Sequence, residues 1–283
     1  MEKKMPHANP LSQYFRQPVI HIRLPSGGNF YPTGTLNMPP NGELPVLPMT
    51  AVDEITYRTP DALFNGSAIV SVIQSCVPSI RDPWVMPSTD IDAVLVAIRI
   101  ASFGHGMDIT TACPACTHEQ ELTLDLRVIN DKILPGSYDQ SLNVGNLEFH
   151  FKPISYREVN QNNQIQFEQQ QALRAMDNDQ VEESAKLEQL NISMRVINQL
   201  TLKTVAQSIG AIKTPDALVT QIEHIFEFLN NCDSRLFAQL RDHVIGLKQA
   251  SEIKPVDLSC TECGHKYAQP FTLDMASFFG DAS

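Results

Sequence analysis

The 283-residue sequence has no hydrophobic run that approaches the ~18 residues of a membrane span. Its first residues, Met1 to His7, carry charge but no apolar stretch like the core of a signal peptide. We therefore expect a soluble protein without a membrane segment, made in a reducing cytoplasm. Disulfide bonds are rare in that compartment.

The motifs of common enzyme classes are also missing: no GxxxxGK[ST] loop, nucleophile elbow, HExxH or dinucleotide fingerprint is present. The carboxylates of Asp82, Asp90 and Asp92 could suggest a divalent-metal or acid-base site. We interpret Asp90 and Asp92 as helix-capping residues instead. Cys76 and Cys232 have no partner at ligand spacing, and we interpret them as small buried hydrophobic residues. We predict no enzymatic activity.

Positive charge is scarce. Charged residues make up 19% of the sequence, the net charge is −11, and the basic residues are scattered. A nucleic-acid-binding protein needs a basic face that displaces counterions from phosphates. We therefore expect other proteins as partners, further copies of the same chain among them, and neither nucleic acid nor membrane.

Two near-identical cysteine knuckles are present, far apart in the chain. Cys113-Pro-Ala-Cys116 and Cys260-Thr-Glu-Cys263 each lead, after a histidine and a few polar residues, into a run built on Leu/Phe-Thr-Leu-Asp. Two CxxC pairs in the same local context form the ligand set of a closed tetrahedral zinc site. We predict that Cys113, Cys116, Cys260 and Cys263 bind one structural zinc. The alternatives are a disulfide pair, which needs an oxidising compartment, or two unrelated thiol pairs.

His118 and His265 lie two residues past the second cysteine of each knuckle. Four thiolates already fill a tetrahedron, so we do not expect either histidine to be a ligand. Each either begins its strand or donates a hydrogen bond to a thiolate. A closed site of this kind has no open position for catalysis.

A shared zinc site would bring the two knuckles together across the chain between them. Together with the helices and strands that the sequence indicates, it leads us to predict an α+β fold. This fold is a helical body with a split tetracysteine zinc-ribbon, a helical insertion between the two halves of the ribbon, and an extended Pro-rich N-terminal arm. The predicted stretches are the arm at 1–48, a helical core at 49–106, the zinc-ribbon at 107–134 plus 254–283, and a hairpin and helical insertion at 135–253.

The predicted arm holds nine of the 19 prolines, which forbid a regular helix. Its aromatic residues, Tyr14, Phe15, Phe30 and Tyr31, make it too apolar for a solvated linker. It should dock on a neighbour or on its own body. Our working hypothesis is that it reaches a neighbouring subunit and that removing residues 1–33 leaves a folded monomer.

Capping signals and apolar periodicity predict the elements. Helices are expected from the Thr59-Pro60 cap, over 68–76, from 88 to a C-cap at Gly104, over 156–177 and 181–208, from a Thr214-Pro215 cap to 230, and over 233–248. Strands are expected over 107–111, 119–126, 141–144 and 147–152, and in the second ribbon half after Cys263.

Several segments resemble the baseplate proteins of T-even-type contractile-tailed phages, a family associated with assembly of the baseplate hub. The resemblance covers roughly residues 19 to 130. It is carried by Leu24-Pro-Ser-Gly-Gly-Asn-Phe-Tyr-Pro32, Leu47-Pro-Met-Thr-Ala-Val-Asp-Glu-Ile55, Pro60-Asp-Ala-Leu-Phe-Asn-Gly66, Asp90-Ile-Asp-Ala-Val-Leu95 and the knuckle at 113–116.

This resemblance implies a non-enzymatic structural or assembly component of a phage tail baseplate that binds other baseplate and hub proteins. It would be found in the host cytoplasm during assembly and in the baseplate of the virion tail if it is retained there. Two other classes stay open: a zinc-ribbon nucleic-acid-associated regulatory factor, and an assembly chaperone whose thiolates release zinc on oxidation.

Overall fold

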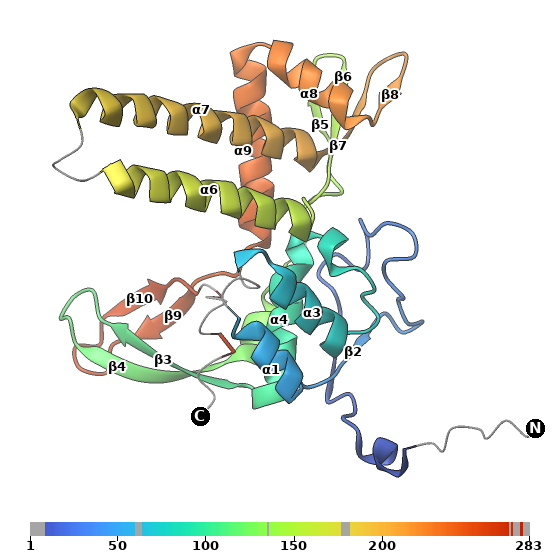
Figure 1. The fold of residues 1–283 in the computed structure, drawn as a ribbon, viewed down its shortest axis with the longest axis vertical. Coiled ribbons are helices and arrows are strands. Elements are labelled where there is room, and N and C mark those ends of the chain that lie inside the picture. The colour runs from blue at the N-terminus through green and yellow to red at the C-terminus, as the bar shows by residue number, and fades with distance from the viewer. Residues whose placement is uncertain are drawn as a thin grey trace, which may run out of the picture.

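The computed structural model describes residues 9–59, 64–134, 136–176, 182–271, 273 and 278–279. It combines helices with small antiparallel sheets, which confirms the α+β class. Figure 1 shows a lower body and an upper lobe, with helix α9 (Ser234–Ser251) running between them. Among the described helices, none is long and apolar enough to cross a membrane.

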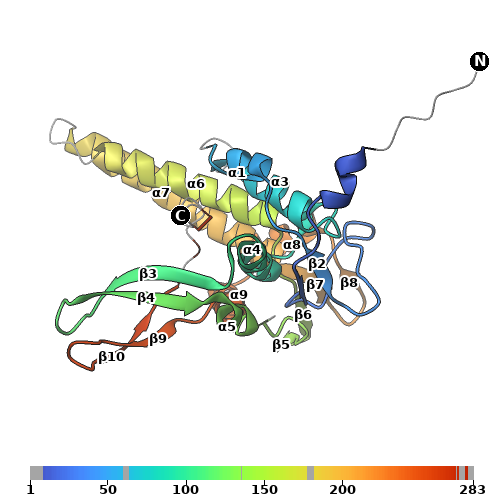
Figure 2. The same ribbon diagram turned by 90° about the horizontal axis from the view of Figure 1, so that it is seen from below.

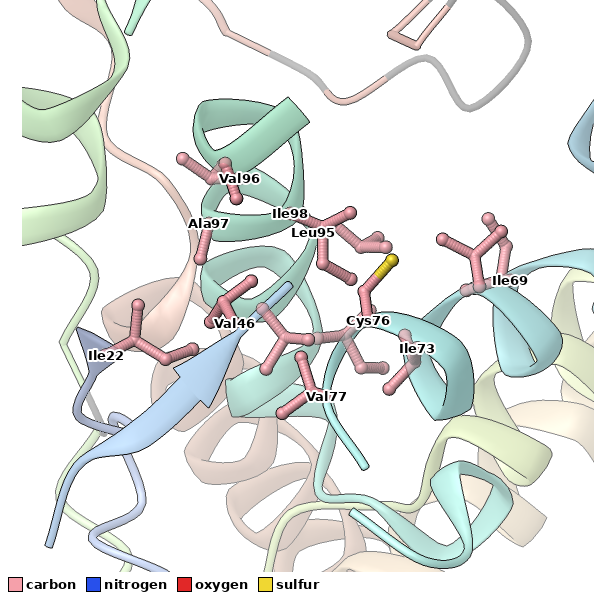
Figure 3. Close-up of a cluster of buried hydrophobic side chains, with 14 of the residues drawn as sticks. Ile22, Val46, Ile69, Ile73, Cys76, Val77, Leu95, Val96, Ala97 and Ile98 are labelled. Atoms are coloured by element: carbon pink, nitrogen blue, oxygen red, sulfur yellow. The ribbon is translucent and has the colours of Figure 1, made fainter. Parts of the chain in front are cut away.

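The lower body is built around helix α4 (Ser88–Phe103), in which residues 94–98 are all 0% exposed. Side chains of α3 (Ser67–Cys76) and of the N-terminal strands pack on it (Figure 3). The body also contains α1 (Ala51–Tyr57), the 3-10 turn η2 (Pro83–Val85) and α5 (Leu126–Asp131). The helices predicted over 68–76 and from residue 88 to the Gly104 C-cap are confirmed, whereas residues 60–63 of the Thr59-Pro60 helix lie outside the described residues.

Much of the predicted arm belongs to this body. Strand β1 (Ile20–Ile22) pairs antiparallel with β2 (Leu44–Val46). Ile22 is 5% exposed and Leu24 is 4% exposed, and both belong to the core cluster around α4. The burial of these two side chains contradicts our expectation that residues 1–33 can be removed from a folded monomer. The first described part, which includes the 3-10 turn η1 (Pro10–Tyr14), projects from the body (Figure 1).

The carboxylate of Asp90 does not cap a helix. Pro87 is the N-cap of α4, and Asp90 is fully buried one turn further on. It accepts hydrogen bonds from the backbone N–H of Ser26 at 2.8 Å, the Ser26 hydroxyl at 2.6 Å and the Tyr31 hydroxyl at 3.0 Å. Asp90 therefore fixes the turn after β1 to the body, and our capping interpretation was wrong. Of the three carboxylates, Asp82 is the one that caps, at η2.

Two short hairpins extend from the body. Strand β3 (Gly106–Ala112) pairs with β4 (Glu119–Asp125), and β9 (Val256–Ser259) pairs with β10 (Lys266–Gln269). The hairpins lie side by side in two views at right angles (Figures 1 and 2). Two residues of the Phe-Thr-Leu-Asp run of the second half, Thr272 and Asp274, lie outside the described residues.

The upper lobe has its own hydrophobic cluster, which is separate from the cluster around α4. Its four-stranded sheet has the order β5-β6-β7-β8. The lobe contains β5 (Leu142–Val144), β6 (Leu147–Phe151), α6 (Tyr156–Met176), α7 (Glu183–Ser208), β7 (Ile209–Lys213), β8 (Leu218–Val219) and α8 (Ile222–Asn231).

One predicted helix start in this lobe is wrong. Thr214 accepts hydrogen bonds from the backbone N–H groups of Asp216 and Ala217, but these close the turn between β7 and β8. Helix α8 begins at Ile222 instead. The threonine side chain satisfies turn N–H groups just as it would satisfy those of a helix.

Candidate metal centre

Each cysteine knuckle is the tip of one ribbon hairpin. The backbone N–H of Cys113 donates to the carbonyl of His118, and that of Cys260 donates to the carbonyl of His265, both at 2.9 Å. The same turn is thus built twice, once on β3–β4 and once on β9–β10. The two histidines contribute carbonyl groups to the turns, and neither belongs to the metal-competent cluster found in the described part of the chain.

Both turns need a left-handed backbone residue directly after the second cysteine. Thr117 has φ of 58° and Gly264 has φ of 70° at the equivalent position. Their N–H groups return to the carbonyls of Cys113 at 2.9 Å and Cys260 at 3.0 Å. Glycine adopts this conformation freely, but a β-branched residue such as threonine is strained there.

The two turns bring all four predicted cysteines together. The Sγ atoms of Cys113, Cys116, Cys260 and Cys263 lie within 4.8 Å of one another. The Sγ–Sγ distance is 3.8 Å between Cys113 and Cys263 and 3.6 Å between Cys116 and Cys260. A tetrahedral ion with metal–sulfur bonds of about 2.3 Å has sulfur–sulfur edges of about 3.8 Å. The donor set therefore fits one tetrahedral ion, and both distances exceed the ~2.05 Å of a disulfide.

The thiols of this cluster differ in their affinity for protons. The backbone N–H of Cys263 and other donors lower the pKa of Cys260 to about 6. At Cys116, the backbone N–H of His118 favours the thiolate, but hydrogen bonds to Cys263 and the other thiols raise the pKa to about 12. Neighbouring thiolates repel one another, so protons or a divalent cation must neutralise them. Soft thiolate donors in a tetrahedron suit zinc.

A polar side chain that the sequence did not single out joins the two hairpins. Gln120, which is 6% exposed, receives hydrogen bonds at its Oε1 from the backbone N–H of Thr261 at 2.9 Å and from the Thr261 hydroxyl at 3.2 Å. Its side-chain amide donates to the Tyr267 hydroxyl at 3.0 Å. Gln120 therefore links strand β4 to both the second knuckle and strand β10.

A second contact supports the same junction. The hydroxyl of Thr111, in β3, donates to Oε1 of Gln269, in β10, at 2.9 Å. Thr111 is 6% exposed. These hydrogen bonds lie next to the cysteine cluster and connect the same two hairpins. Side chains as well as the four cysteines therefore join the two halves.

The remaining cysteines lie apart from this centre. Cys76 is fully buried in the core of the body, where burial raises the pKa of its thiol to about 11. Cys232 is partly buried at the end of α8. The interpretation as a small buried hydrophobic residue is confirmed for Cys76, whereas Cys232 is only partly buried against the cluster of the upper lobe. A raised pKa makes Cys76 a poor nucleophile.

Comparison with known proteins gives one informative result. Neither the curated proteins nor the solved structures give a match to this chain. The model of one family, described as T4 bacteriophage base plate protein, matches residues 40–280, and this range includes both knuckles and the whole upper lobe. The match is much longer than the 19–130 region that we compared by motif, and it covers most of the chain. The chain therefore belongs to the T4 bacteriophage base plate protein family.

Proposed function

We propose that this protein is a non-enzymatic structural or assembly component of the hub region of a contractile phage tail baseplate, stabilised by one structural zinc. The observation that carries the proposal is the family match over residues 40–280. The protein would bind other baseplate proteins in the host cytoplasm during assembly and in the tail of the virion.

The geometry of the cysteine cluster supports a structural role for the metal. Four thiolates from two hairpins use all four positions of a tetrahedral ion and leave none for water or substrate. The ion would hold together segments that are 144 residues apart, as Cys116 and Cys260 are. Its role would be to fix the relative positions of β3–β4 and β9–β10.

The N-terminal segment offers a surface for a protein neighbour. Leu11 is 63% exposed, Tyr14 is 77% exposed and Phe15 is 57% exposed. The next residue, Arg16, is anchored on the body through hydrogen bonds to Pro48, Asp53 and Ser75. An apolar segment held out from the body by a fixed base favours docking on another protein, because each exposed apolar side chain gains roughly 25 cal/mol per Å² on burial.

The charge of the ribbon argues against the nucleic-acid alternative. Residues 106–125 and 256–269 contain six acidic residues and one basic residue, Lys266. A ribbon that binds phosphates needs the opposite balance. The ribbon is therefore better suited to a protein partner.

Affinity purification of a tagged protein from infected cells tests the proposal. The expected result is copurification with baseplate proteins, unchanged by nuclease treatment. The variant Tyr14→Ala/Phe15→Ala should lose these partners, whereas Val128→Ala, which alters a half-exposed valine on α5, should keep them. Partners that disappear after nuclease treatment would support the nucleic-acid-associated class instead.

A further inference from the structure

Helix α7 buries polar side chains and exposes apolar ones over its N-terminal half. Ser193 is 1% exposed and bonds to Gln169 of α6 at 3.0 Å, so the contact between these two helices is polar here. In contrast, Leu187 is 57% exposed and Met194 is 55% exposed. A helix normally turns its apolar stripe toward its packing partner. The stripe on α7 lies beside this polar contact, and α6 does not bury it.

Four exposed side chains form one continuous stripe, which we call the α7 seam: Leu187, Leu190, Met194 and Ile197. Leu190 is 46% exposed and Ile197 is 40% exposed, so no described element covers the stripe. The spacing of three, four and three residues keeps all four on one side of the helix, as in a coiled coil. In Figure 1, this half of α7 projects beyond α9 with α6 along one side.

The residue spacing along the α7 seam, three, four and three, is the same from either end. When two α7 helices pack antiparallel about a two-fold axis near residue 192, Leu187 lies opposite Ile197 of the second copy, and Leu190 lies opposite Met194. A two-fold contact requires a surface that is complementary to itself in this way. Asn191 and Asn198, which flank the seam, are uncharged.

The charge beside the seam is compatible with the same occupant. Over residues 183–197 of α7, two basic and two acidic residues cancel, while the whole chain carries −11. Two copies that pack through this half of α7 therefore bring no net charge together.

We infer that the α7 seam is a self-association surface, on which α7 of a second copy packs antiparallel to form a two-fold dimer. The seam residues become buried against one another, and α6 remains on the outside of the helix pair. This assignment does not depend on the baseplate role, because it rests only on the exposure, spacing and charge of this half of α7.

Analytical ultracentrifugation of the full-length, zinc-loaded protein across a micromolar concentration series tests this inference. The expected result is a monomer–dimer equilibrium. Leu190→Glu and Met194→Lys should each raise the dissociation constant at least about tenfold, since each places an unpaired charge in the buried seam. Combined in one chain, they should restore the dimer, because antiparallel packing sets each introduced carboxylate against an introduced ammonium group.

The matched control is Ile192→Glu, which places the same charge on the same helix but outside the seam. Ile192 is 41% exposed, and this variant should dimerise as the unmodified protein does. Far-UV circular dichroism and zinc content establish that each variant is folded. A chain that stays monomeric throughout the series, a dimer that Leu190→Glu leaves intact, or a double variant that stays dissociated would overturn the inference.

Discussion

Oε1 of Gln120 lies 2.9 Å from the backbone nitrogen of Thr261, a residue 141 positions further along the chain. The contact joins the second strand of one hairpin to the knuckle of the other, and it leaves the amide of Gln120 free to bond to Tyr267. The two ribbon halves are therefore matched by a specific hydrogen-bonding group and not only by the metal-competent cysteines.

Replacing Gln120 should weaken this junction. Gln120→Met keeps the side-chain length but removes the acceptor of the Thr261 N–H and hydroxyl and the donor to the Tyr267 hydroxyl. We expect a loss of about 2 kcal/mol in the free energy of unfolding, measured by urea denaturation of the zinc-loaded protein. Gln161→Met, at an exposed position on α6, should change it by less than about 0.5 kcal/mol. Equal stabilities of the two variants would contradict the role of Gln120.

Metal analysis should find about one zinc per chain. Cys260→Ser should lower the metal content and the melting temperature, because metal binding at such sites contributes on the order of 10 kcal/mol to folding. Cys232→Ser is the matched control and should retain the metal. A protein without zinc, or one whose melting is unchanged in Cys260→Ser, would refute the structural zinc. Reversible release of zinc by a mild oxidant would support the redox-responsive alternative.

The two knuckles provide an internal comparison of backbone strain. Thr117→Gly should stabilise the zinc-loaded protein by roughly 1 kcal/mol, because glycine tolerates the positive φ that threonine resists. Gly264→Thr makes the opposite change at the equivalent position and should cost about 1–2 kcal/mol. Chemical denaturation measures both. The prediction fails if the two substitutions shift stability in the same direction.

Asp92 should make stability depend on pH. Burial, followed by the Glu252 carboxylate, raises the pKa of Asp92 to about 6, with Lys248 acting in the opposite direction. As the pH rises, the unfolded chain, in which the pKa of Asp92 is 3.8, loses this proton at a lower pH than the folded protein does. Proton binding by Asp92 therefore stabilises the folded protein below about pH 4. This contribution, up to about 3 kcal/mol, is lost as the pH rises through about 6.

Asp92→Asn should remove this dependence. The variant should melt at a higher temperature than the unmodified protein at pH 8, and at a similar temperature at pH 4, in scanning calorimetry. Asp216→Asn, at the exposed turn between β7 and β8, is the control. A variant that is less stable than the unmodified protein at pH 8 would show that the charged carboxylate is favourable there.

Truncation should separate the projecting N-terminal segment from the part packed on the body. Deleting residues 1–15 should change the unfolding free energy by less than about 1 kcal/mol, because Leu11, Tyr14 and Phe15 are exposed. Deleting residues 1–33 should cost several kcal/mol, since it removes the buried Ile22 and Leu24 and leaves Asp90 without Ser26. Comparable melting curves for the two truncations would contradict the packing of β1.

Local and repeated signals in the sequence were enough to predict the cysteine cluster. Each CxxC turn depends on a few adjacent residues, and the repetition of its context identified the partner across more than a hundred positions. The apolar stripes of α4, α8 and α9 likewise reveal helices, because one period describes the whole element.

Features that depend on distant chain segments were not predictable in this way. Nothing near Gln120 indicates that it faces Thr261, and Asp90 has the sequence context of a helix start although its partner, Ser26, lies 64 residues earlier. Strand β7 begins at Ile209, directly after the last residue of α7. It is a strand because it pairs with β6, which lies far away in the sequence. The turn at Thr214 uses residues that are equally suited to a helix start.

The separation of the two knuckles also sets an order of events during protein synthesis. Cys116 leaves the ribosome 144 residues before Cys260. At about 5–20 residues per second, this interval is roughly 7–30 seconds. Through that time, the first pair of thiols has no counterpart, and the intervening helices and sheet can form first. The sulfur cluster can close only on a chain that has been translated at least as far as Cys263, so its closure marks the arrival of the second hairpin.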